Sequence, residues 1–107
     1  DNRDLKMKIV VIGDEDTVLA FSVLGVTPVP VNSSSEMLKQ FEEYMTERDI
    51  GLIILTENYA KDIEDTINSY RLKKPYPAVI RIPSRKERER VVLDYSRILK
   101  KVIGFRT

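Results

Sequence analysis

Two uninterrupted apolar runs constrain the fold of this chain more than any other feature. Residues 7–13 read MKIVVIG and residues 50–57 read IGLIILTE, and a helical pattern follows each run at once. A strand that is apolar at every position is covered on both faces, which is typical of parallel sheets. The sequence therefore predicts a chain of strand–helix units.

The remaining strands and helices follow from turn residues and periodicity. We expect four strands, over residues 8–13, 26–31, 50–55 and 78–82, and three helices, over residues 17–25, 34–48 and 57–72. Pro28 and Pro30 remove two backbone donors, so the second strand belongs at an edge, whereas the wholly apolar third strand belongs in the centre. The predicted fold is α/β: a four-stranded parallel sheet sandwiched by helices, Rossmann-like or receiver-like, with a further C-terminal amphipathic helix.

Each predicted helix has an N-terminal cap and an apolar stripe. Asp14 to Asp16 cap the first helix, Ser33 and Glu36 have the spacing of a capping box, and Thr56 caps the third helix. The inward stripes, at helical spacing, are Val18, Phe21 and Leu24; Met37, Leu38, Phe41, Tyr44 and Met45; and Tyr59, Ala60, Ile63, Ile67 and Tyr70.

Charge divides the chain into two parts. Residues 1–80 hold 9 basic and 14 acidic side chains, and residues 81–107 hold 9 basic and 3 acidic. We expect a sheet domain over residues 7–84, then a charged lead-in and an amphipathic helix within residues 85–107, with residues 1–6 as an extension before a natural start at Met7. A basic element on an acidic domain suggests an acidic partner or nucleic acid.

Several classes of function lack the residues that they need. The chain has neither Cys nor His, Gly13 stands alone where a glycine-rich phosphate loop would be, and no apolar run reaches membrane-spanning length. We therefore expect no cofactor, no metal site and no catalytic site. A receiver-like magnesium site at Asp14 and Asp16 would need an acidic acceptor after the third strand, where Thr56 and Glu57 stand, so helix capping is the favoured interpretation.

Two C-terminal features remain. The stretch 85–90, RKERER, interleaves Glu with Arg, and such pairs partly neutralise one another, so a solvated helix start is favoured over nucleic-acid binding. The amphipathic pattern over residues 91–103 either covers the sheet as a fourth helix or binds a partner, and one segment can do both.

Four segments resemble the F subunit of the archaeal A-type and vacuolar V-type rotary ATPases. They are IGDEDTV at 12–18 with Phe21 and Gly25, IGLIILTE at 50–57, PAVIRIPS at 77–84 and LKKVIG at 99–104. Together they span nearly all of residues 7–105. Ala20, where many relatives have Gly, and the charged lead-in at 85–90 depart from the pattern.

The resemblance implies a non-catalytic rotor subunit of the central stalk, coupling ATP synthesis or hydrolysis to ion transport on the cytoplasmic side of a membrane. It implies contact with the elongated coiled-coil D subunit and, through the terminal helix, with the catalytic ring. The membrane is reached only through the complex, and no nucleic acid is involved. The implied partner-binding residues are Tyr95, Arg97, Ile98, Leu99, Lys100, Lys101, Val102 and Ile103. A degenerate receiver-like regulatory module is the alternative.

Overall fold

The computed structural model describes residues 7–84, so the extension expected over residues 1–6 and the helix expected over residues 91–103 lie outside the described residues. The described part forms one parallel sheet of four strands, β1 (Lys8–Gly13), β2 (Thr27–Pro30), β3 (Ile50–Thr56) and β4 (Ala78–Ile82), in the order β2-β1-β3-β4. The predicted α/β fold is confirmed, as are the edge position of β2 and the interior position of β3.

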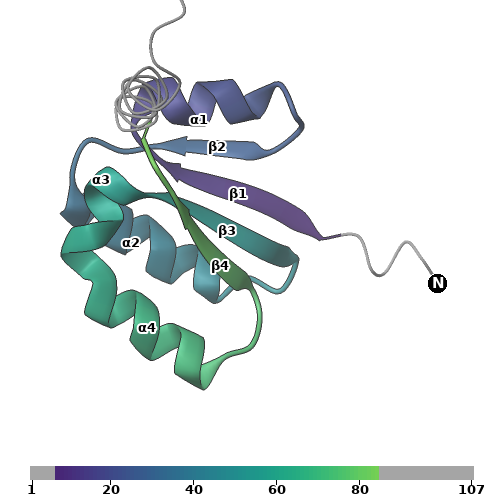
Figure 1. Cartoon of the computed structure of the whole chain (residues 1–107). Helices are drawn as coiled ribbons and strands as arrows, with labels where there is room; N and C mark the ends of the chain where they lie inside the picture. The colour runs from purple at the N-terminus through teal and green to yellow at the C-terminus, as the bar shows by residue number, and fades with distance from the viewer. Residues whose placement is uncertain (1–6, 85–107) are drawn as a thin grey trace, which may run out of the picture.

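Helices cover the two faces of the sheet unequally. Helix α1 (Glu15–Ser22) lies on one face, and α2 (Ser34–Met45), α3 (Glu57–Ala60) and α4 (Glu64–Lys73) lie on the other (Figure 1). The larger core lies under these three helices; its fully buried side chains are Val10, Ile12, Met37, Phe41, Ile53, Leu55, Ala60 and Ile67. The smaller core, under α1, joins Val11, Val18 and Ile54.

Helix α1 has its cap among the predicted residues, but it begins at Glu15 instead of Thr17 and ends early, at Ser22. The Oδ2 atom of Asp14 accepts hydrogen bonds from the Thr17 backbone N (3.2 Å) and the Thr17 hydroxyl (2.8 Å), so Asp14 is the N-cap. The expectation that the helix reaches Gly25 with Leu24 facing inward is wrong. The Leu24 N–H bonds the carbonyl three residues back, which tightens the chain into a turn, and Gly25 adopts a φ of 81°. Leu24 is 72% exposed.

Helix α2 agrees with its predicted stripe and, in part, with its predicted cap. The Ser33 hydroxyl accepts from the Glu36 N–H (3.1 Å), but the Glu36 carboxylate accepts from the N–H of Asn32 (3.2 Å) instead of that of Ser33. The capping box therefore reaches one residue further back than expected. Of the expected stripe, Met37, Phe41 and Met45 are buried, and Leu38 and Tyr44 pack partly against the core.

The single helix expected over residues 57–72 is wrong, because the chain breaks it into α3, a 3₁₀ turn η2 (Lys61–Ile63) and α4. Ile63 has a φ of −123° and a ψ of 24°, outside the helical region. The hydroxyl of Ser34 donates to Asp62 (2.7 Å) and so ties the break to the start of α2. The break leaves Ala60, Ile63 and Ile67 in one core cluster, so the expected inner face is confirmed.

Candidate functional site

The partner-binding residues expected from the sequence all lie beyond the described part of the chain. They are Tyr95, Arg97, Ile98, Leu99, Lys100, Lys101, Val102 and Ile103. The structure therefore leaves them as a prediction. It does describe the point from which that segment leaves the sheet domain: β4 ends at Ile82, and Ser84, two residues further, is 5% exposed.

One half of the sheet is uncovered by any described helix. In a parallel sheet, paired neighbours share a face, and the pairs Leu52–Ala78, Ile54–Ile80 and Thr56–Ile82 place these side chains on the face that carries α1. Helix α1 packs mainly on β2 and β1. We call Leu52, Ala78, Ile80 and Ile82 the bare sheet face. Ile80 is 43% exposed, Ala78 is exposed, and Leu52 and Ile82 are half-buried.

An arginine anchors β4 from the opposite face. The guanidinium of Arg81 pairs with the carboxylate of Glu57, at the start of α3, and with that of Glu64 (2.5 Å), at the start of α4. Its side chain is 19% exposed. The hydrogen bonds that Arg81 donates to Glu57 and, with smaller effect, to Glu64 raise the pKa of Arg81 above its usual value. This cluster fixes the end of β4 against the starts of α3 and α4.

A second anchor holds the outer side of β4. The Arg71 guanidinium donates to the carbonyl of Val79 (2.5 Å), and the Lys74 ammonium donates to the carbonyl of Met45 (2.8 Å) at the end of α2. Both bonds tie α4 and the loop after it to the sheet domain. Since the Arg71 side chain already bonds the carbonyl oxygen of Val79 on the edge strand β4, that oxygen is less available to pair with a further strand.

Polar side chains gather where β1 and β3 end. Asp14 follows β1, Thr56 ends β3, and Asn58 lies in the first turn of α3. Among the described residues, Asp14 Oδ1, Thr56 Oγ1 and Asn58 Oδ1 are buried oxygen atoms without a hydrogen-bond partner. Thr56 stands at the N-cap position of α3, as expected, but its side chain makes no capping hydrogen bond.

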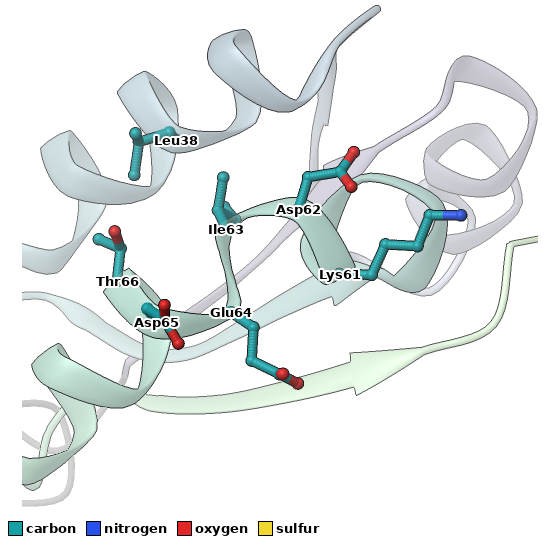
Figure 2. A pocket seen from close by; sticks show the side chains of 7 residues that line it. All are labelled: Leu38, Lys61, Asp62, Ile63, Glu64, Asp65 and Thr66. Atoms are coloured by element: carbon teal, nitrogen blue, oxygen red, sulfur yellow. The ribbon is translucent and has the colours of Figure 1, made fainter.

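A shallow pocket of 440 Å³ lies at the break between α3 and α4, beside Leu38 of α2 (Figure 2). Its rim carries the exposed carboxylates of Asp62, Glu64 and Asp65. Two of them are already engaged, since Asp62 accepts from Ser34 and Glu64 pairs with Arg81. The pocket therefore lies where α2, η2 and α4 meet, and two of its three rim carboxylates already have partners within the protein.

Two further kinds of feature are missing from residues 7–84. No group of three or more Cys, His, Asp or Glu side chains gathers there as metal ligands do. In the same part of the chain, no helix has both the length and the apolar character needed to cross a membrane.

Sequence reasoning missed the bare sheet face and the unpaired oxygens. The signal for the bare sheet face was present: Ala78, Ile80 and Ile82 alternate with Val79 and Arg81, so one side of β4 is apolar throughout. Only the position of α1 shows that this side is uncovered. The unpaired state of Asp14 and Thr56 depends on the pairing of distant strands and has no local signal in the sequence.

The fold and these surfaces define a doubly wound α/β domain with a partly exposed apolar sheet face. A solved structure with the same fold is that of the V-type ATP synthase F subunit from Archaeoglobus fulgidus, with a TM-score of 0.58 and 23% identity over 72% of this chain and 98% of that one. At that identity the likeness concerns the fold alone.

Sequence comparison identifies the family. A family model described as ATP synthase (F/14-kDa) subunit matches residues 9–100. The V-type ATP synthase F subunit of Fusobacterium nucleatum is 45% identical over 77% of this chain and 76% of its own length. The protein of the same name from Clostridium botulinum is 43% identical over 72% and 73%. The A-type ATP synthase F subunit of Methanococcus maripaludis strain S2 is 40% identical over 74% and 76%. The chain belongs to the F-subunit family of A-type and V-type ATP synthases.

Proposed function

We propose that this chain is a non-catalytic rotor subunit, docked in the central stalk of an A/V-type ATP synthase beside the elongated coiled-coil D subunit. The observation that carries the proposal is the extent of the family match, which runs from residue 9 through the sheet domain to residue 100. The match therefore includes most of the amphipathic segment 91–103. In this role the protein lies on the cytoplasmic side of the membrane and couples ATP synthesis or hydrolysis to ion transport.

The sheet domain has the stiffness that a rotor part needs. Its interior strands are fully buried at Val10, Ile12, Ile53 and Leu55, and close-packed interiors have low compressibility and transmit strain. The Arg81 cluster joins β4 to α3 and α4 at the exit of the chain. Torque applied at that exit is thus passed to the whole sandwich.

We further propose that residues 91–103 form a helix that docks on the bare sheet face in one state and on the catalytic ring in another. Thirteen helical residues span about 20 Å, close to the length of about 17 Å expected for the five residues of β4. The chain leaves the sheet from the end of β4, so the helix can fold back along that strand. The expected apolar contacts of this helix are Tyr95, Ile98, Leu99, Val102 and Ile103, and its expected charged contacts are Arg97, Lys100 and Lys101.

The two docking surfaces compete on comparable terms. Fully burying one large apolar side chain contributes about 1.5–3 kcal/mol, so full burial of all five would contribute about 8–15 kcal/mol on either surface. Only the difference between the surfaces sets the population of each state, and a difference of about 1.4 kcal/mol changes their ratio tenfold. A ligand or neighbouring protein that favours one surface can therefore move the helix.

Co-expression with the D subunit of the same organism tests the rotor assignment. We expect the full-length chain to co-elute with the D subunit in a stoichiometric complex on size exclusion. Leu72→Glu serves as a control variant, because Leu72 is 90% exposed on α4 and lies away from the bare sheet face. We expect this variant to form the same complex with the D subunit. Absence of a complex with the full-length chain would refute the rotor assignment.

A further inference from the structure

Three acceptor oxygens without partners lie near the β1–β3 boundary. They are the carboxylate Oδ1 of Asp14, the hydroxyl Oγ1 of Thr56 and the amide Oδ1 of Asn58. Thr56 has no exposed surface. Buried polar atoms are normally hydrogen-bonded, and each exception calls for a physical explanation.

The close approach of β1 to β3 accounts for the placement of the Thr56 side chain. A Cβ atom built at Gly13 would lie 2.3 Å from Thr56 Oγ1, so the Thr56 side chain occupies the space beside Gly13. Asp14 follows Gly13 directly, and Asn58 lies two residues beyond Thr56. The Thr56 hydroxyl therefore lies between β1 and β3, next to the residue that precedes Asp14.

The topology makes this boundary the switch point of the sheet. From β1 the chain passes to β2 on one side, and β3 lies on the other side, with α1 and α3 on opposite faces. Ligands of open α/β sheets bind in the crevice at the carboxyl ends of the strands, where the strand order reverses. Asp14 and Thr56 stand at that position, as the residues that follow β1 and end β3, and Asn58 lies in the first turn of α3 after them.

We propose that Asp14 Oδ1, Thr56 Oγ1 and Asn58 Oδ1 bind a divalent cation of the Mg²⁺ or Ca²⁺ type. Carboxylate, hydroxyl and amide oxygens are the hard ligands that such ions take. All three atoms are out of contact with solvent, so a small ion reaches them with less rearrangement than a guanidinium or an ammonium on a side chain. Asp14 and Asn58 are themselves half-buried, so the proposed site borders solvent.

The charge around the site favours a cation, but the single carboxylate ligand makes the affinity of the site for it modest. Asp14 contributes the one carboxylate ligand, and the exposed side chains of Glu15 and Asp16 add negative potential beside it. The other Asp14 oxygen is held by Thr17, which fixes the carboxylate in place. Since calcium affinity falls as the number of charged ligands falls, we expect a dissociation constant of about 10⁻⁴–10⁻³ M.

Paramagnetic broadening by Mn²⁺ tests the proposal on the full-length, ¹⁵N-labelled protein. We expect substoichiometric Mn²⁺ to broaden first the amide signals of Gly13, Asp14 and residues 56–58. Excess Mg²⁺ or Ca²⁺ restores these signals. Broadening centred instead on the exposed carboxylates of residues 62–65 would overturn the proposal.

Matched variants separate ligation from general attraction. Asp14→Asn keeps an N-cap side chain while removing the charged ligand, and Thr56→Val keeps the shape while removing the hydroxyl; each is expected to weaken Mn²⁺ binding tenfold or more. Glu15→Gln removes the same charge from the exposed neighbour and is expected to weaken it less than threefold. Equal losses in Asp14→Asn and Glu15→Gln would refute specific ligation. The test requires no other protein of the ATPase complex, so its result is independent of the rotor assignment.

Discussion

Replacing Gly13 by Ala is expected to destabilise the protein, although the effect of this change on the entropy of the unfolded chain would by itself be stabilising. Among the glycines of the described chain, only Gly25 has a positive φ. At a compatible position Gly→Ala stabilises by about 0.4–1 kcal/mol, because the unfolded chain loses freedom. The new methyl group at Gly13, however, would lie 2.2 Å from Thr56 Cγ2, 2.3 Å from Oγ1 and 2.7 Å from Cβ.

These overlaps set the magnitude. Relief requires β1 to move from β3 or Thr56 to leave its place, and Thr56 is fully buried. Overpacking of a core costs about 1–3 kcal/mol, and contact with a Cβ atom places Gly13→Ala at the upper end, a net loss of about 2 kcal/mol after the unfolded-state gain. For a domain of this size that loss lowers Tm by roughly 10 °C.

The assay is urea denaturation of the wild type and three variants, followed by far-UV circular dichroism. Gly51→Ala is the matched control: its methyl group would lie 2.7 Å from Cβ of Met7, but Met7 is 50% exposed and can move. In the double variant Gly13→Ala with Thr56→Ala, two of the three overlaps disappear, so part of the loss is recovered. A stability for Gly13→Ala equal to or above that of the wild type would refute the reasoning.

Three further predictions concern single side chains. Phe41→Ala removes a fully buried ring that packs edge-on against Tyr70 at 5.4 Å; we expect a loss of about 3–5 kcal/mol in the same denaturation assay, and a loss below about 1 kcal/mol would contradict it. Ser33→Ala removes the N-cap acceptor of α2 and is expected to cost about 1 kcal/mol, whereas Ser33→Asp retains most of the stability. The hydrogen bond that Tyr70 donates to Glu42 raises the pKa of the Tyr70 phenol above 10.0. The protonated phenol therefore stabilises the folded protein fully at pH values below the pKa that Tyr70 has in the unfolded chain. This stabilisation is lost as the pH rises through the higher pKa of the folded protein. NMR titration of the ring should show Glu42→Gln lowering the pKa, and an unchanged pKa would refute the hydrogen bond as its cause.

The sequence predicted the sheet because its signals were local and strong. The unbroken apolar runs of β1 and β3, and the prolines at 28 and 30, set strand positions and the edge within one or two residues. The inward stripe of α2 also followed directly from helical spacing.

The departures come from interactions that no local window contains. The expected helix over 57–72 breaks at Ile63, where Ser34 on α2 bonds Asp62. Leu24 was expected inside because its spacing from Val18 and Phe21 is helical, yet the turn before Gly25 leaves it exposed. In both cases the apolar period continues through a segment whose backbone has left the helix.

The candidate surfaces were predicted only in part for the same reason. The amphipathic segment 91–103 is indicated by its period and stays a prediction, whereas the bare sheet face depends on where α1 packs. The cap at Asp14 was predicted, whereas the burial of its second oxygen had no local signal in the sequence. Contacts between segments distant in sequence thus created both candidate surfaces.

Hydrogen exchange of residues 91–103, in the free full-length chain and in the complex with the D subunit and the catalytic ring, most directly tests the exchange of docking surfaces. Ile80→Glu places a charge on the bare sheet face, and Leu72→Glu is its control. We predict that Ile80→Glu abolishes protection of residues 91–103 in the free chain and leaves it unchanged in the complex. Protection as strong as that of β3 in both states, with or without Ile80→Glu, would contradict the account.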